Sequence, residues 1–552
     1  MSYYKFLTAV AALALTGLMA GVTFAQSVTL DGKSLTVEQV AEVARNPQTG
    51  IAIDRDAEER LQQGFDLVME AATQGTPIYG LTVGVGWNKD RPAFKVEDGE
   101  RVLDQELLEL SRAFNISQMR AHAAGFGDAM PREDVRAGMV IRLNQMLTGA
   151  TGVQPEIAEM YRQFLIHDIV PVVPGRGSLG EADITLAAHI GLAMLGEWKV
   201  DYKGQRMEAA AALADAELTP VEPVGKDFLS VISSNAVTAG QAVLLAQDTD
   251  KYLRRHVVEF ALALEGYNGN VSPFLEGTTE IRPFPGMMHA SDKIRAALEG
   301  SYLWAPSETR GLQDPLSFRT MGYTLGSAFE ALESLTDTLK IQINHTDDNP
   351  ASLAPHDYAG ESEQVQSYQV ANAGAIYPTA NFEFLPVTDK VEALNQALGR
   401  LSRSVVMQTI RFENPELTGL PRFLAAEGND GLAFGALQVP MTALAAEARQ
   451  LSLPVSMDGF ATSAGIEDVA SNGPLAVANL RRLLDLNYQL LSMQLLHTAQ
   501  AVDLRESVSL GKETARLLAA YREQVPFVEK DRPFTDDISL GEEFLRDFDV
   551  KK

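Results

Sequence analysis

Long stretches of the chain repeat apolar residues at helical spacing on more than one face. Beyond about residue 225 these stretches contain almost no residue that breaks a helix, and residues 473–507 (GPLAVANLRRLLDLNYQLLSMQLLHTAQAVDLRES) are typical. The others are residues 228–266, 317–345, 389–412 and 439–453. Helices of this length that are apolar on several faces are buried in bundles. The sequence therefore predicts a mainly α-helical protein with a long central bundle.

The N-terminal part has a mixed pattern. Residues 28–44 predict a short strand and a helix, and further stretches have helical periodicity: residues 55–74, 104–125, 132–149 and 154–168. No fixed-period repeat and no low-complexity linker divides the chain. We therefore predict a mixed N-terminal region over residues 26–225, followed by the bundle and C-terminal helices over residues 226–552.

The first 25 residues have the pattern of a cleaved export signal. One Lys precedes an apolar run from Phe6 to Gly21, and the small residues Thr23 and Ala25 follow at a spacing that suits signal peptidase. An uncleaved membrane anchor is the alternative, but the run is short for a membrane span. No other stretch is long and apolar enough to span. We expect a periplasmic or secreted protein that does not bind a membrane after cleavage.

Composition narrows the chemistry. The net charge of −27, with no basic cluster, argues against a nucleic-acid partner, because polyanions repel. The chain has no Cys, which excludes disulfides, thiolate nucleophiles and Cys-ligated zinc. Its eight His residues show no HExxH motif and no pair at a spacing of three or four, so we expect no His-based metal site. Phosphate-loop and dinucleotide-binding patterns are also absent.

Several loop motifs occur in the order in which one known family has them. They are YGLTVGVG, RAHAAGFG, QDPLSFR, INHTDDNP, TANFEFLPV and LPVSMDGFATSAGIEDVAS. Through them the chain resembles the histidine/phenylalanine/tyrosine ammonia-lyase family over nearly its whole mature length. The resemblance implies a mainly helical fold with a central bundle. It also implies a homotetramer whose active sites draw on several subunits.

One motif departs from the family pattern. Family members carry an Ala-Ser-Gly sequence that cyclises to methylidene-imidazolone, an electrophile that activates the substrate amine. Here the corresponding stretch, GSLGEADITLAAH (residues 177–189), is one residue shorter and contains Glu181, Ala182 and Asp183 instead. Ala182 lacks the hydroxyl whose elimination makes the methylidene group, so we expect no cofactor. In two further departures, Ser233-Ser234-Asn235 replaces Asn-Gly-Thr and Leu316 replaces the Tyr of the QDxY motif.

The two acids of the altered motif suggest a different leaving group. A trimethylammonium group is permanently cationic and departs as neutral trimethylamine without an electrophile. Carboxylates at Glu181 and Asp183 would stabilise that cation, so we assign both to catalysis. The structural alternative is that Asp183 is the N-cap of the following helix and that Glu181 adds favourable charge at its N-terminus.

The remaining site residues follow from the resemblance. Tyr79, on a glycine-rich loop that could act as a lid, matches the family's catalytic base, whose pKa must be lowered to work near neutral pH. Arg319 matches the residue that binds the substrate carboxylate, a task for which a planar guanidinium is suited. A packed loop aromatic and an internal ion pair are the respective structural alternatives.

The other assignments concern the substrate pocket. His122 matches a position near the substrate side chain, and Ser233 belongs to the altered Asn-Gly-Thr segment. Asn344 and Asn381 are polar site-liners by resemblance, although either could simply hold loop backbone. Glu447 matches a helical acid that contacts the amine or side chain, and its Ala-rich neighbours argue for burial. Lys390 could reach an anionic side chain such as a thiolate, or only solvent.

The functional prediction is a carbon–nitrogen lyase. Family members that lack the prosthetic group and release trimethylamine are ergothionase-type enzymes, which convert ergothioneine to thiourocanate. The expected substrate is therefore an aromatic betaine, with hercynine also possible. A conventional histidine or tyrosine ammonia-lyase or aminomutase would need the electrophile. A catalytically silent periplasmic relative would have no use for the base Tyr79 beside the anchor Arg319.

Overall fold

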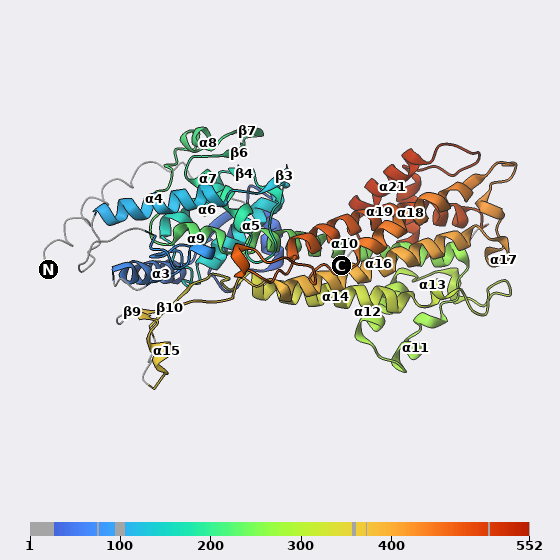
Figure 1. Cartoon of the computed structure of the whole chain (residues 1–552). Coiled ribbons are helices and arrows are strands. Elements are labelled where there is room, and N and C mark those ends of the chain that lie inside the picture. Colours follow the sequence, from blue (N-terminus) through green and yellow to red (C-terminus); the bar gives the residue numbers. More distant parts are fainter. Residues whose placement is uncertain are drawn as a thin grey trace.

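The computed structural model describes residues 27–73, 77–93, 105–355, 360–370, 373–505 and 508–550. The molecule is elongated, with a mixed N-terminal region at one end from which a helical bundle extends (Figure 1). The predicted export signal, residues 1–25, lies outside the described residues.

The N-terminal region begins with the predicted strand and helix. β1 (Ser27–Leu30) pairs in parallel with β2 (Gly50–Ile53), and α2 (Val37–Arg45) connects them. A capping box fixes the start of α2, because the Thr36 side chain accepts from Gln39 N–H while the Gln39 side chain accepts from Thr36 N–H. The helices that follow are α3 (Arg55–Thr73), α4 (Gln105–His122), α5 (Arg132–Met146), α6 (Pro155–Ile166), α7 (Ile184–Met194), α8 (Ala209–Asp215) and α9 (Asp227–Ile232).

Small sheets tie the connections together. The antiparallel pair is β3 (Phe126–Ala129) with β5 (Pro174–Arg176), and the sheet beside it contains β4 (Val170–Pro171), β6 (Lys199–Tyr202) and β7 (Gln205–Glu208). Another antiparallel sheet has the order β8 (Ala351–Leu353), β10 (Gly374–Tyr377), β9 (Gln369–Val370). Together with α15 (Glu363–Gln366), it projects from the molecule (Figure 1).

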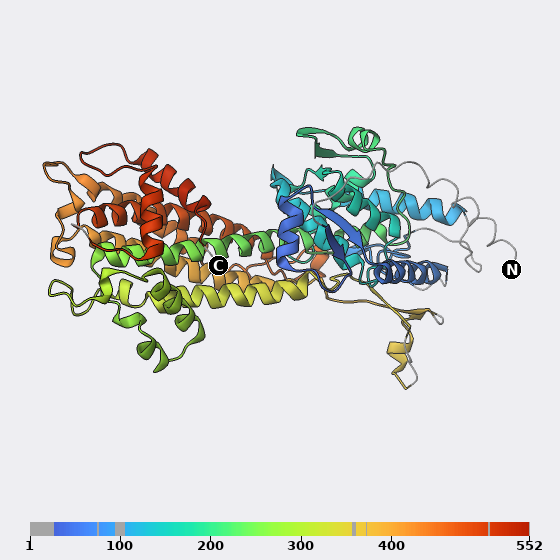
Figure 2. The same ribbon diagram turned by 180° about the vertical axis from the view of Figure 1, so that it is seen from behind.

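The bundle consists of four long helices. They are α10 (Ala236–Tyr267), α14 (Met321–Gln342), α16 (Leu385–Phe412) and α19 (Gly473–Asp503). α19 packs against α16 and α10, and α14 packs against α16, as the view from behind shows (Figure 2). Shorter helices cover the bundle: α11 (Glu276–Glu280), α12 (Pro285–Ala297), α13 (Leu316–Arg319), α17 (Pro415–Thr418), α18 (Gln438–Leu451), α20 (Lys512–Arg522) and α21 (Thr535–Asp547).

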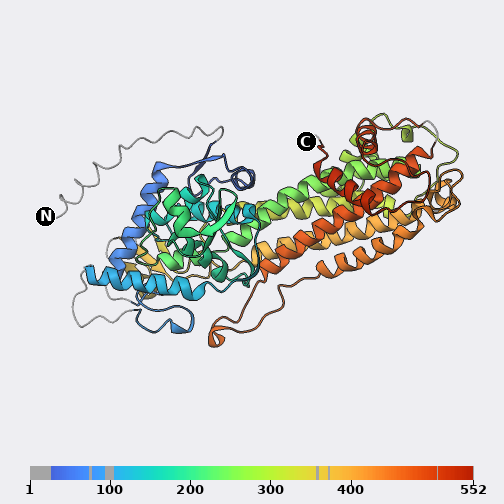
Figure 3. The same ribbon diagram turned by 90° about the horizontal axis from the view of Figure 1, so that it is seen from above.

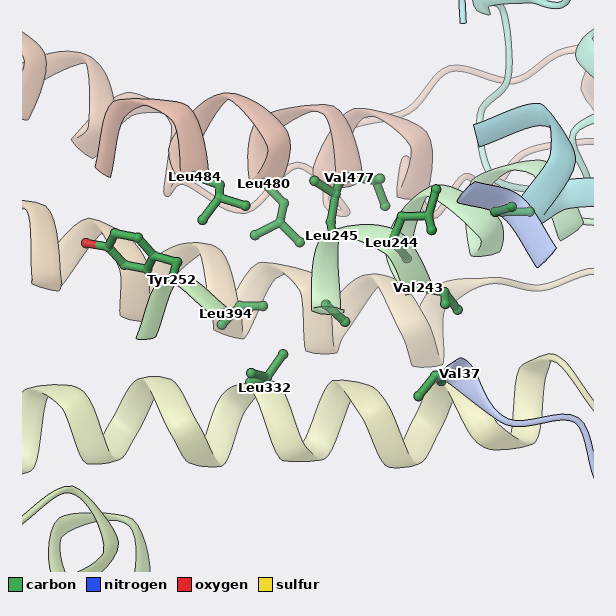
Figure 4. Close-up of a cluster of buried hydrophobic side chains, with 14 of the residues drawn as sticks. Val37, Val243, Leu244, Leu245, Tyr252, Leu332, Leu394, Val477, Leu480 and Leu484 are labelled. Atoms are coloured by element: carbon green, nitrogen blue, oxygen red, sulfur yellow. The ribbon is translucent and has the colours of Figure 1, made fainter. Parts of the chain in front are cut away.

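The main hydrophobic core runs along the bundle axis. Val243 and Leu245 of α10 lie among Leu394 of α16 and Leu480 of α19, and Val37 brings α2 onto the same core (Figure 4). All of these side chains are buried. Burying an aliphatic side chain of this size contributes roughly 1.5–3 kcal/mol, so the four helices hold one another in place. The predicted mainly helical fold with a central bundle is confirmed.

Two of the predicted helices are interrupted. The stretch 228–266 breaks at residues 233–235, where polar side chains bond to other loops, and the stretch 317–345 breaks at Thr320, between α13 and α14. The expectation that no later stretch could span a membrane was wrong by length and composition, because Asp227–Tyr267 passes that test. Its most apolar window is 94% buried inside the protein, which is typical of a core helix.

Candidate active site

The altered motif forms a strained loop between β5 and α7. Gly177 and Gly180 have φ angles of 132° and 85°, and Ala182 has a φ of 65° although it is not glycine. A left-handed conformation costs an L-residue roughly 1–2 kcal/mol. Such strain persists only where the surroundings enforce it, and it is concentrated at functional sites. Ala182 is buried, so the surrounding protein fixes the shape of this turn.

Residues just before α19 hold this loop. The Ser471 hydroxyl donates to Gly180 O at 3.0 Å, and Asn472 N donates to Leu179 O at 2.8 Å. A Cβ on Gly180 would lie 2.2 Å from the Ser471 oxygen, so this close approach requires glycine. The main-chain N–H of Ser471 also donates to Glu181 Oε1 at 2.9 Å. The altered loop is thereby fixed to the first turn of α19.

Asp183 is buried and turned toward α10. Its carboxylate accepts from the N–H of Thr238 at 2.8 Å and from the Thr238 hydroxyl at 2.7 Å. Burial raises the pKa of Asp183 despite these hydrogen bonds. Asp183 occupies the N-cap position of α7 but makes no side-chain cap bond there. Asp183 was expected, as the structural alternative, to cap the helix that follows it. Its carboxylate instead caps α10.

Glu181 lies opposite Glu383. The two residues form an isolated antiparallel bridge between the altered loop and the turn that precedes α16. Burial, and then the charge of Glu383, raise the pKa of Glu181 to about 7. Asn381 is exposed in the same turn, and the Asn235 side chain donates to Phe382 O at 2.6 Å. Sequence reasoning missed Glu383, although it stands in the quoted motif TANFEFLPV.

Tyr79 lies in a tight turn after α3. Its hydroxyl accepts from Gly86 N–H at 2.8 Å, and Gly80 adopts a φ of 67° where a Cβ would lie 2.3 Å from Leu229. Burial raises the pKa of Tyr79, the hydrogen bond from Gly86 lowers it, and the charge of Glu467 raises it further. The net direction is upward. The lowered pKa that a base requires is therefore not produced by the described part of a single chain.

One loop connects the Tyr79 turn with the altered motif. The connection between α18 and α19 is long (Figure 3), and η7 (Ser463–Gly465) within it contacts η2 (Gly86–Asn88) beside Tyr79. Ser471, which binds Glu181, lies four positions after Glu467, whose charge acts on Tyr79. Four residues span at most about 14 Å, so Tyr79 and Glu181 belong to one region. The loop also exposes Phe460, which is 91% accessible.

A buried ion network holds the loops next to this region. Asp348 accepts from Arg142 at 2.7 Å and from Lys226 at 3.0 Å, and all three side chains are almost fully buried. Asp347 accepts from Arg142 at 3.2 Å and from Asn235 N–H at 2.9 Å. The network fixes the INHTDDNP loop against the beginning of α10. Sequence reasoning did not predict Arg142 or Lys226 here, because charged residues are rarely fully buried.

The pocket residues predicted by resemblance divide into those near this region and those elsewhere. Ser233 is buried, and its hydroxyl accepts from Asn349 N–H at 3.3 Å. His122 is half-buried, with its ring 6.1 Å from that of Phe228 on α9. Lys390 is half-buried on α16. Asn344 holds loop backbone, because its amide oxygen and nitrogen are both bonded to the main chain of Leu35 at 2.8 Å.

Two predicted site residues have side-chain partners outside this region. Arg319 is on α13, at the end of the bundle far from the N-terminal region (Figure 1), and donates to Gln313 at 3.0 Å. Glu447 forms an ion pair with Arg482 at 2.8 Å, and its side chain is 41% exposed. The expected burial of Glu447 was therefore wrong for the single chain, because α18 presents much of its Ala-rich surface outward.

The residues present do not fit a methylidene-imidazolone group. Ala182 supplies a methyl group where the hydroxyl would be needed, and Asp183 N–H is engaged by Ser234 O at 2.7 Å. Within the described ranges, no group of three or more His, Asp or Glu side chains is placed to hold a metal ion. The side chains that gather in the region include a tyrosine, carboxylates and an amide.

Most of the chain matches known proteins. The sequence pattern described as aromatic amino acid lyase matches residues 35–523. The histidine ammonia-lyase of Stigmatella aurantiaca is 31% identical over 512 residues, which are 92% of this chain and 94% of that protein.

Solved structures agree. The ergothioneine-degrading ergothionase of Treponema denticola, in complex with desmethyl-ergothioneine sulfonic acid, is 34% identical with a TM-score of 0.86, covering 94% of this chain and 99% of that one. The tyrosine aminomutase of Streptomyces globisporus is 28% identical with a TM-score of 0.82, covering 94% and 97%.

Proposed function

The chain belongs to the aromatic amino acid lyase family, and on this premise we propose that the protein is a carbon–nitrogen lyase that eliminates trimethylamine from an aromatic betaine. The proposed substrate is ergothioneine and the proposed product thiourocanate. The similarity to an ergothioneine-degrading enzyme, at 34% identity, supports this choice over a free amino acid.

The observation that carries the proposal is the acidic pair that the altered loop forms. Where the family forms an electrophile, this chain places Glu181 opposite Glu383. Carboxylates attract a permanent cation and offer nothing to activate a neutral amine. A quaternary ammonium group needs no activation, because it leaves as neutral trimethylamine.

The elimination requires one base. The Tyr79 oxygen, as tyrosinate, takes the β-proton of the substrate; the C–H electron pair becomes the new C=C bond, and the C–N pair leaves with trimethylamine. Without substrate, burial and the charge of Glu467 raise the pKa of Tyr79. A permanent cation bound nearby lowers the pKa of a phenol, so substrate binding itself favours the tyrosinate.

The substrate carboxylate needs a cationic anchor, and Arg319, the residue predicted for that task, lies far from Tyr79 in the same chain. We propose that Arg319 of a second copy provides it in a homotetramer. Arg319 lies at the far end of the bundle from Tyr79, beside the exposed apolar residues Leu312 and Leu316. Exposed apolar surface of this kind is typical of subunit interfaces. The proposal includes export to the periplasm or medium after cleavage of residues 1–25.

The test is a substrate panel. Purified protein is incubated with ergothioneine, hercynine, histidine and tyrosine, while trimethylamine, ammonia and the ultraviolet absorption of the conjugated acid are followed separately. We expect trimethylamine from a betaine and no ammonia from histidine. Release of ammonia from histidine as fast as trimethylamine from ergothioneine would refute the proposal.

A further inference from the structure

The pairing of the altered loop with the turn before α16 identifies a residue with no role so far. We propose that Glu383 is a substrate-binding residue: Glu181 and Glu383 form a carboxyl pair that binds the substrate's trimethylammonium group. The inference rests on the proposed function, because it names what the replaced loop binds.

Main-chain N–H groups hold both members of the pair. Glu181 Oε1 accepts from Ser471 N–H at 2.9 Å, and Glu383 Oε1 accepts from Leu385 N–H at 2.8 Å. The two residues stand opposite each other across an isolated antiparallel bridge. Two carboxylates held in this way repel each other when both are ionised. The geometry therefore describes an acid pair that a proton or a bound cation would stabilise.

The buried side chain of Asn235 lies beside the same turn. Asn235 is 1% exposed, and its Nδ2 is fixed by the bond to the carbonyl of Phe382, the residue before Glu383. Its Oδ1 is buried and has no hydrogen-bond partner in the structure. The amide group therefore presents an unsatisfied acceptor next to the acid pair. A buried polar atom without a partner is rare in native proteins and needs an explanation. A cationic ligand is one.

The charged residues named around the pair are acidic. Among the described residues, the charge that acts on Glu181 is that of Glu383, which is acidic. Asp183, two residues along the loop, is engaged by Thr238, and Glu467, on the segment that contains Ser471, acts on Tyr79. Two neighbouring ionised acids without a cation repel each other, so a proton on one of them is favoured. A bound cation removes that repulsion.

This arrangement predicts a linkage between binding and protonation. The pKa of Glu181 is raised to about 7 by burial and by the charge of Glu383. Below that pH Glu181 holds a proton, which a cation must displace; above it Glu181 is ionised. Substrate affinity should therefore increase as the pH rises through about 7, and binding below that pH should release roughly one proton per site.

The experiment measures binding separately from turnover. Titration calorimetry with ergothioneine is done on a Tyr79→Phe background, so that substrate is bound but not consumed, in two buffers of different ionisation enthalpy at pH 6.5. Glu383→Gln should weaken binding roughly tenfold or more and reduce proton release, because removal of the Glu383 charge lowers the pKa of Glu181. Glu181→Gln should abolish proton release.

Matched variants separate this role from loss of fold. Asp389→Asn removes an exposed acid from α16, beyond the turn, and should bind like the background. Glu383→Asp keeps the charge and should retain measurable proton release, even if Glu383→Gln distorts the turn. With Tyr79 intact, the midpoint of the pH dependence of kcat/KM should move to lower pH in Glu383→Gln, a change that a merely structural role would not cause.

The outcomes distinguish the two proposals. If Glu383→Gln binds ergothioneine like the background and releases the same number of protons, the pair is wrong, whatever the enzyme releases. If protein with intact Tyr79 releases no trimethylamine but the background binds ergothioneine with proton release that depends on Glu383, the pair stands and the proposed reaction fails. If the background does not bind ergothioneine, both fail.

Discussion

The two ends of the helical bundle hold their predicted functional side chains in different ways. At the inner end, next to the N-terminal region, the altered loop, the INHTDDNP loop and the start of α19 are fixed by buried ions and main-chain hydrogen bonds. At the outer end, Arg319 makes one side-chain hydrogen bond, to exposed Gln313, and Leu312 nearby is 89% accessible. The inner end is built within one chain, whereas the outer end still has apolar surface to cover.

The difference indicates how the predicted site is divided. Tyr79, Glu181 and Asn381 gather at the inner end, where rigidity can orient reacting groups. Arg319 is at the outer end, where a neighbouring copy could bring it onto another chain's Tyr79. Substitutions at each end in turn test this division of the site.

The largest effect is expected at the base. Tyr79→Phe removes the proton acceptor but keeps the ring, so turnover should fall roughly 10²- to 10⁴-fold while substrate binding persists. Steady-state kinetics with trimethylamine detection and titration calorimetry measure the two effects. A variant with full turnover would show that the inner end does not contain the base.

A second change attacks the rigidity of the inner end. Asp348→Asn leaves Arg142 and Lys226 buried without their shared carboxylate, which should cost about 3–5 kcal/mol of folding free energy. The urea midpoint followed by circular dichroism measures this loss. Asp215→Asn, which breaks an exposed pair with Lys203, is the control and should change the midpoint little. Equal shifts in both variants would mean that the network does not stabilise the inner end.

A smaller effect is expected at the outer end. Arg319→Ala removes a charge-assisted contact to the substrate carboxylate and should lower kcat/KM roughly 10- to 100-fold. The melting temperature should hardly change, because Arg319 donates a single side-chain hydrogen bond, to exposed Gln313.

Mixing the two variants tests whether the ends meet between chains. Tetramers assembled from equal amounts of Tyr79→Phe and Arg319→Ala subunits should regain activity in about a quarter of their sites, if each site takes Tyr79 from one chain and Arg319 from another. No recovery in co-expressed mixed tetramers would place both residues in one chain's site, against the observed separation.

The smallest effect is expected at Glu447. Its exposed pair with Arg482 should contribute less than about 1 kcal/mol, so Glu447→Gln should change the urea midpoint little. If Glu447 contacts the substrate amine, as the resemblance implies, the same variant will raise KM. An unchanged KM would confine Glu447 to the surface of the bundle.

Sequence reasoning predicted the helices better than the loops between them. Periodicity depends on local spacing, so the long helices were found within a few residues of their bounds. The pairing of Glu181 with Glu383 depends on two loops about 200 residues apart in sequence, and no local pattern encodes it. The burial of Lys226 was equally hidden, since composition favours exposure. Alanine-rich sequence around Glu447 suggested burial because small apolar residues suit both a core and an interface.

The cap that Asp183 places on α10 makes the altered loop and the longest helix one mechanical unit. The loop cannot lift away from the site without releasing the N–H of Thr238 and fraying the first turn of a helix that runs the length of the bundle. Opening of the loop is therefore coupled to local unfolding, and the Thr238 amide should exchange its hydrogen with solvent at the rate of loop opening. Hydrogen exchange at that single amide therefore reports how often the loop opens.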